Sequence, residues 1–202
     1  MRKPNIRVSA GAAILLAALY LLLDFETIGA VALCVAVHEA GHLAALRALG
    51  SRVRGIRLGL TGLCITYKGR TGYGGQFAAA FAGPVFGAVF ALISARLGTE
   101  YENSFLCLCA GISAILSVFN LLPVQPLDGG RMLSAVLCAR WEITRAERAA
   151  RAAGIAAGLV LMSAGLVLIW IGKGAAMEIA AVWLMLSQPN DVHSLVKMPG
   201  VL

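Results

Sequence analysis

The sequence predicts an all-α polytopic membrane protein with about six transmembrane helices and a small β-hairpin on the cytoplasmic side. Three observations lead to this fold class. First, the 202 residues are 59% hydrophobic and only 13% charged, whereas a soluble domain of this size needs more charge to cover its surface. Second, the mean hydropathy is +0.83, and apolar runs that could cross roughly 30 Å of hydrocarbon recur along the chain. Third, the basic residues are concentrated on one side of these runs.

Six apolar segments reach or approach the roughly 20 residues that a transmembrane helix needs. In order, they are Val8–Leu23, Ile28–Leu49, Gln76–Leu97, Phe105–Leu122, Gly154–Ile171 and Ala175–Leu186. We interpret the first as a retained helix rather than a cleaved signal peptide, because a second apolar segment follows it at once. Before the fifth segment, Thr144-Arg145-Ala146-Glu147 predicts a capping box and a helix that begins in the cytoplasm. Since no internal repeat or linker interrupts the pattern, residues 1–202 are predicted to form a single integral-membrane domain.

The distribution of basic residues predicts the orientation in the membrane. With the N-terminus in the cytoplasm, most basic residues face that side, as the positive-inside rule requires. They are Arg2, Lys3, Arg7, Arg47, Arg52, Arg54, Arg57, Lys68, Arg70, Arg131, Arg140, Arg145, Arg148 and Arg151. The opposite side receives Arg96 and Lys173. The net charge of +7 therefore indicates topology and contact with anionic lipid, and we expect no nucleic-acid partner.

Residues Arg52–Lys68 differ from the flanking apolar segments in their periodicity. Hydrophobic residues alternate on each side of Thr61-Gly62, which predicts two short strands around a turn that contains glycine. The alternating residues are Ile56, Leu58, Leu60, Leu63, Ile65 and Tyr67. A hairpin in this place would have an edge able to hold an extended peptide, while an ordinary connecting loop is the alternative.

The second apolar segment contains the motif His38-Glu39-Ala40-Gly41-His42. Residues four apart share one face of a helix, so His38 and His42 can bind one metal ion together. Glu39 then projects beside that ion, where it can take a proton from an attacking water molecule. Such polar groups are energetically expensive inside a membrane. The alternative is that they only join helices through hydrogen bonds, which accounts for a histidine but not for a glutamate between two histidines.

A third ligand has to come from another segment, because a catalytic zinc site has three protein ligands and one open position. The end of the fourth segment, Asn120–Arg131, contains two prolines and two glycines, which predict a break in the helix at membrane depth. Asp128, expected on this non-helical stretch, is an anionic ligand that can complete the set. Asn120 offers an amide that could bind the substrate backbone or stabilise an oxyanion.

The paired motifs resemble those of the site-2 protease family of intramembrane zinc metalloproteases. The resemblance rests on H-E-A-G-H in the second segment and on N-L-L-P-V-Q-P-L-D-G-G about 80 residues later. It implies that His38, His42 and Asp128 bind one zinc ion per chain and that Glu39 activates water. Ala82-Gly83-Pro84 is similar to an A-G-P element of that family, but Gly87 stands where relatives often have a polar residue.

The family resemblance covers about residues 28–131, the expected catalytic core. Many relatives carry PDZ or CBS domains, and we expect neither here. The chain is similar to the compact bacterial branch that includes sporulation proteases acting on membrane-bound sigma-factor precursors.

The function expected from this resemblance is hydrolysis of a peptide bond in or near a transmembrane segment of a membrane-bound substrate. Such a substrate would be a membrane-tethered transcription or sigma factor precursor, or an anti-sigma factor. A regulatory membrane protein is a further candidate partner. The expected location is the cell membrane, with the active site towards the cytoplasm. Two alternatives are a catalytically silent membrane adaptor of the same fold and a metal transporter that uses the same three ligands as a transit site.

Overall fold

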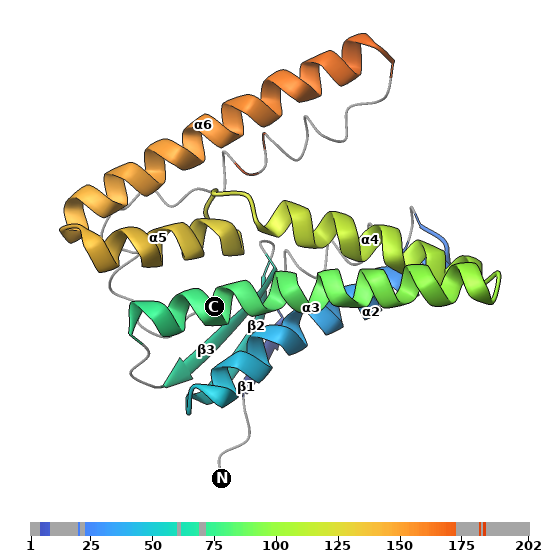
Figure 1. Ribbon diagram of the computed structural model, residues 1–202, viewed down its shortest axis with the longest axis horizontal. Helices are drawn as coiled ribbons and strands as arrows, with labels where there is room; N and C mark the ends of the chain where they lie inside the picture. Colours follow the sequence, from blue (N-terminus) through green and yellow to red (C-terminus); the bar gives the residue numbers. More distant parts are fainter. Residues whose placement is uncertain are drawn as a thin grey trace.

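The structure is a computed structural model that describes residues 5–8, 20, 23–59, 62–68, 72–172, 182 and 184. For the strands it describes the backbone alone. The described part contains five helices and a three-stranded sheet (Figure 1). The helices are α2 (Phe25–Ala48), α3 (Tyr73–Glu100), α4 (Ser104–Asn120), α5 (Asp128–Arg140) and α6 (Ile143–Trp170). The strands are β1 (Asn5–Val8), β2 (Arg52–Gly59) and β3 (Gly62–Lys68).

Three of the described helices, α2, α3 and α6, are long and apolar enough to cross a membrane, and α4 is a shorter apolar helix. These four helices correspond to the second to fifth predicted segments. The first and sixth predicted segments lie almost entirely outside the described residues, so the expectation of six crossings stays a prediction. Val8, placed in the first segment, instead ends β1. The sequence Asn5–Val8 alternates polar and apolar residues, as a strand does.

The sheet lies beside the end of α2, and its strand order is β1-β2-β3 (Figure 1). β2 and β3 pair antiparallel, with Ile56 opposite Ile65 and Leu58 opposite Leu63. β1 pairs parallel to β2, with Ile6 opposite Ile56. Residues 60–61, which would form the predicted turn, lie outside the described part of the chain. The tight hairpin turn and the peptide-binding edge therefore stay predictions.

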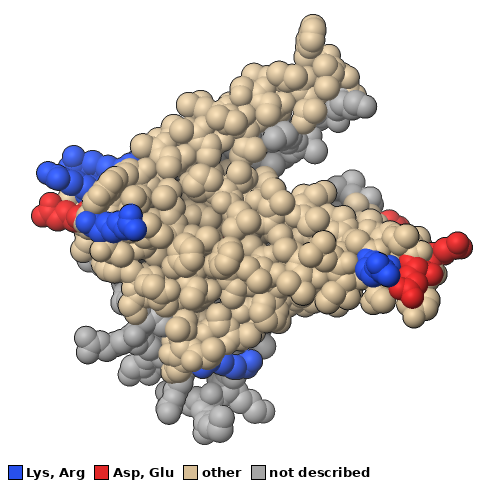
Figure 2. Space-filling view, viewed as in Figure 1, with Lys and Arg blue, Asp and Glu red and all other residues tan. Residues whose placement is uncertain are grey.

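Most charged side chains of the visible face gather at the two ends of the helices, and the middle of that face carries none (Figure 2). Arg140, Glu142 and Arg145 are exposed where α5 meets α6. Arg96 and Glu100, exposed near the end of α3, form an ion pair with a nitrogen-to-oxygen distance of 3.8 Å. This distribution is the one expected for helices whose middle sections face hydrocarbon.

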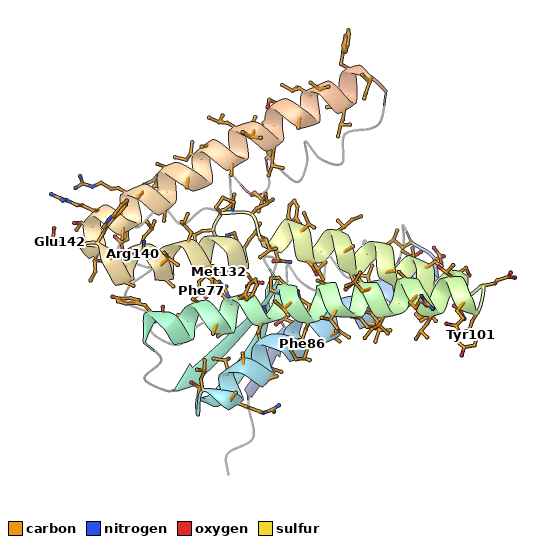
Figure 3. All side chains as sticks on the ribbon, in the orientation of Figure 1. Phe77, Phe86, Tyr101, Met132, Arg140 and Glu142 are labelled. Carbon is orange, nitrogen blue, oxygen red and sulfur yellow. The ribbon has the colours of Figure 1, made fainter. Side chains whose placement is uncertain are left out.

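α3 is the central helix, because it contacts α2, α4 and α5 (Figure 1). Its approach to α2 depends on small residues. A Cβ added to Gly41 would lie 2.6 Å from the carbonyl oxygen of Ala82 and 2.9 Å from the Cβ of Phe86. Phe86, labelled in Figure 3, therefore packs directly over the bare α-carbon of Gly41. Close packing of this kind is a main source of helix association in a membrane.

The prediction that Asp128 lies on a non-helical stretch is wrong. The break after α4 ends at Leu127, and Asp128 is the first residue of α5. Gly129 and Gly130 lie in the first turn of that helix, and the preceding loop packs onto them. A Cβ on Gly129 would overlap the carbonyl of Leu121, and one on Gly130 would lie 2.6 Å from the carbonyl carbon of Val124. These glycines therefore permit loop-to-helix packing and do not end a helix.

The predicted capping box is also wrong. α6 begins at Ile143 with Glu142 at the N-cap position, and no side chain caps it. Since Glu142 already has the extended backbone of an N-cap residue, Thr144 lies inside the helix. Glu147 cannot reach back to an N-cap amide, and it is instead buried with its Oε1 atom unpartnered.

Candidate metal centre

α2 holds both histidines of the motif in the interior of the helix bundle. The helix begins at a defined point, because the Asp24 carboxylate accepts hydrogen bonds from the Thr27 amide (3.0 Å) and the Thr27 hydroxyl (2.7 Å). These bonds also lower the pKa of Asp24 below its ordinary value, because they favour the carboxylate. Four turns later, His38 and His42 are 5% and 4% exposed, and their Nε2 atoms lie 3.2 Å apart.

Asp128 joins the two histidines from the start of α5. Its Oδ2 atom lies 3.0 Å from Nε2 of His38 and 3.2 Å from Nε2 of His42, and the residue is 5% exposed. One ligand atom from each of the three residues falls within 4.8 Å of the others. The structure therefore brings together the residues that the two sequence motifs indicate, although they are up to 90 positions apart.

A backbone carbonyl of α3 fixes the orientation of the His42 ring. Nδ1 of His42 donates a hydrogen bond of 2.7 Å to the carbonyl oxygen of Ala79. Pro84 lies further along α3, where its missing N–H leaves the carbonyl of Ala80, four residues earlier, without a helical donor. The sequence reasoning missed Ala79, and its side chain gives no signal, because only its main-chain oxygen is used.

The three residues fit a metal ion. Because the Nδ1 proton of His42 is engaged by Ala79, Nε2 of His42 keeps its lone pair and points it at Nε2 of His38 and at the Asp128 carboxylate. Acceptor atoms this close repel one another unless a cation or a proton lies between them. Two imidazole nitrogens and a carboxylate are a donor set that Zn²⁺ takes at catalytic sites.

Gly83 of α3 leaves the space that this donor set needs. A Cβ at position 83 would overlap Nε2 of His42 and would lie 2.9 Å from Nε2 of His38. The A-G-P element therefore serves the site through its glycine, whose bare α-carbon faces both ligand nitrogens. The sequence shows Ala82-Gly83-Pro84 as a motif but gives no sign that its glycine contacts the histidines.

The other two predicted site residues lie on α2 and at the end of α4. Glu39 is partly buried on α2 and follows His38. Consecutive residues of a helix point about 100° apart, so Glu39 flanks the ligands. Asn120 is the last residue of α4, and its Nδ2 donates a 2.9 Å hydrogen bond to the carbonyl of Leu116 in the same helix. The role predicted for Asn120 in binding substrate or an oxyanion stays a prediction.

Comparisons with known proteins agree with this chemistry. Residues 94–166, which include Asp128 but not the histidines, match the model of a family described as Peptidase family M50. The chain is also 34% identical over 145 residues to a protein of Mycobacterium tuberculosis described as "Putative zinc metalloprotease Rip3". Over the matched residues the chain is therefore similar to the M50 peptidases. A further relative, 34% identical over 116 residues, is "Putative zinc metalloprotease sll0528" of Synechocystis.

The chain spans only about a third of the length of these relatives. The similarity to Rip3 extends over 64% of this chain and 35% of Rip3, and the similarity to sll0528 over 54% of this chain and 30% of that protein. The fold of the chain is similar to that of the solved "Site-2 Protease from Methanocaldococcus jannaschii", with a TM-score of 0.70 over 93% of this chain and 91% of that one. Because the two are 18% identical, this likeness establishes the fold alone.

Proposed function

We propose that this chain is an intramembrane zinc metalloendopeptidase that hydrolyses a peptide bond in or near a transmembrane segment of a membrane-bound substrate. The observation that carries the proposal is the buried convergence of His38, His42 and Asp128 between helices of a bundle that contains three candidate membrane spans. Polar residues at membrane depth mark functional sites. The match of residues 94–166 to the model of peptidase family M50 supports the same function.

Each side chain of the site has a distinct role in the proposed reaction. When bound to the three ligands, zinc supplies a Lewis acid for the scissile carbonyl and makes an attacking water molecule more acidic. The Glu39 carboxylate takes the proton of that water and returns it to the leaving amine nitrogen. The Ala79 carbonyl holds His42 in the tautomer that presents Nε2, and the negative charge of Asp128 offsets part of the cation's charge.

Because the three ligands are buried, the conformation of the substrate decides whether its peptide bond can reach them. A helical segment has its carbonyls hydrogen-bonded to amides four residues later, so it must unwind locally before a carbonyl can enter the site. Residues that break helices in the substrate would therefore favour cleavage. The edge of the sheet beside α2 is our candidate for holding the unwound stretch, because an exposed strand can pair with an extended peptide.

The proposed location is the cell membrane, with the N-terminus and the site towards the cytoplasm. This orientation rests on the excess of basic residues in the segments assigned to that side. The substrates we propose are membrane-tethered transcription or sigma factor precursors and anti-sigma factors. A regulatory membrane protein is the further partner.

The zinc content of the detergent-purified protein, measured by mass spectrometry, tests the proposal without a substrate. We expect about one zinc ion per wild-type chain. In Asp128→Ala we expect zinc affinity to fall by more than the roughly 10- to 100-fold that loss of an outer hydrogen-bond partner costs. Glu100→Ala removes an exposed carboxylate at the end of α3 and should leave the zinc content unchanged. A folded wild type without metal would overturn the proposal and favour the silent adaptor, and zinc uptake into vesicles would favour the transporter.

A further inference from the structure

The two histidines of the metal centre differ in how their second ring nitrogen is held. Nδ1 of His42 has the Ala79 carbonyl as its partner, whereas Nδ1 of His38 is buried and has no hydrogen-bond partner among the residues that the structure describes. A neutral imidazole that offers Nε2 to a metal carries its proton on Nδ1. Metal-bound histidines almost always donate that proton to a carboxylate, a carbonyl or water. His38 therefore needs an acceptor near its Nδ1 atom.

Two buried serines of α4 face this part of the site, and both are oriented as acceptors. The hydroxyl of Ser117 donates a 2.8 Å hydrogen bond to the carbonyl of Ser113. The hydroxyl of Ser113 donates a 2.9 Å hydrogen bond to the carbonyl of Gly87 on α3. A hydroxyl has one proton and two lone pairs. Since each proton is already engaged, each serine oxygen has only lone pairs left to offer.

The hydroxyls of both serines and Nδ1 of His38 lie close to the position that a side chain at Gly87 would occupy. A Cβ built at position 87 would overlap Oγ of Ser117, and it would lie 3.6 Å from Oγ of Ser113 and 3.7 Å from Nδ1 of His38. The Ser117 hydroxyl therefore reaches into the space that a side chain at position 87 would need, and Nδ1 of His38 borders the same space. The polar group that the sequence analysis found missing at position 87 is supplied instead by α4.

We propose that Ser117 is a positioning residue for His38: its hydroxyl oxygen accepts the Nδ1–H of His38, directly or through one bridging water, and so holds the ring with Nε2 towards the metal. This inference rests on the proposed metal centre. It gives each histidine its own acceptor, a main-chain carbonyl of α3 for His42 and a side-chain hydroxyl of α4 for His38. It also explains why two serines one turn apart are buried in an otherwise apolar helix.

The test exchanges the Ser117 hydroxyl for a methyl group that fills part of the same space. Ser117→Ala removes the oxygen, and Gly87→Ala in the same chain adds a Cβ that would have overlapped that oxygen. The double variant therefore keeps the packing between α3 and α4 but removes the acceptor. Ser163→Ala is the matched control, because it removes a hydroxyl that donates to a helix carbonyl (2.8 Å) on α6, outside the site.

Zinc affinity is measured by chelator competition on the full chain in detergent, together with the thermal unfolding temperature of the zinc-free protein. We expect the double variant to unfold at the wild-type temperature and to bind zinc roughly 10- to 100-fold more weakly, while Ser163→Ala matches the wild type. Wild-type zinc affinity in a folded double variant would overturn the role of Ser117 and leave the metal centre standing. A wild type without zinc affinity would overturn the proposed function itself.

A spectroscopic measurement separates positioning from general packing. In the Co²⁺-loaded protein, the Nδ1–H protons of both histidines should give exchangeable, paramagnetically shifted proton signals. In the double variant we expect the His38 signal to be lost to fast exchange with water, while the His42 signal, held by Ala79, persists. Equal persistence of both signals would overturn the inference.

Discussion

Replacing Glu39 by glutamine is expected to abolish cleavage of a membrane substrate while the protein keeps its zinc. Glutamine has nearly the same shape but cannot accept the proton of an attacking water, and loss of a positioned general base costs about 10²- to 10⁴-fold in rate. None of the three ligand atoms belongs to residue 39, so metal binding is expected to survive. The measurement is the yield of truncated product from a co-expressed, epitope-tagged substrate, with zinc content determined on the same purified variant.

The matched control for this variant is Glu100→Gln, which changes an exposed carboxylate at the end of α3 and should cleave at the wild-type rate. Full activity of Glu39→Gln would rule out the proposed proton transfer. A parallel loss of zinc and activity would instead indicate that Glu39 helps to hold the metal, which the geometry of the three ligands does not predict.

Gly83→Ala should destroy the metal centre although it adds a single methyl group. The new Cβ would overlap Nε2 of His42 and crowd Nε2 of His38, so either α3 moves away from α2 or the ligand nitrogens turn out of place. Alanine is favoured over glycine inside a helix by roughly 0.5–1 kcal/mol, so helix propensity alone predicts the opposite outcome. We expect zinc affinity and proteolysis to fall by more than the roughly 10- to 100-fold that loss of one outer hydrogen-bond partner costs.

Gly111→Ala provides the comparison, because a Cβ at that position on α4 meets no atom of the described part of the chain within 4 Å. This variant should bind zinc as the wild type does and unfold at the same or a slightly higher temperature. If Gly83→Ala also bound zinc normally, the close contact between α3 and the histidine pair described here would be wrong.

The sequence indicated which three residues meet at the candidate metal centre, but it did not indicate the backbone conformation around Asp128. The spacing of His38 and His42 follows directly from helical periodicity, and Asp128 stands out because it is an acidic residue at the end of an apolar segment. That Asp128 opens a helix was not foreseen, because the two glycines after it normally indicate a break. Only the packing of Leu121 and Val124 onto those glycines explains why a helix begins there.

The parts of the site that the sequence could not predict are those that depend on contact between separate helices. Ala79 contributes a main-chain oxygen, which no residue type signals. Gly83 and Gly87 acquire their roles from what lies opposite them, namely the histidine nitrogens and the Ser117 hydroxyl. The pair Ser113 and Ser117 could have been noticed as small polar residues on one face of an apolar helix, but the partner of that face is not visible in the sequence.

β1 was missed because its partner, β2, lies far along the chain.

The separation of the ligands along the chain has a consequence for how the protein is made. His38 and Asp128 are 90 positions apart, and a ribosome adds roughly 5–20 residues per second. A nascent chain therefore carries both histidines for roughly 4 to 17 s before the aspartate exists. Throughout that interval the growing polypeptide lacks one of the three residues of the candidate metal centre, so the proposed site can form only after both motifs have been synthesised.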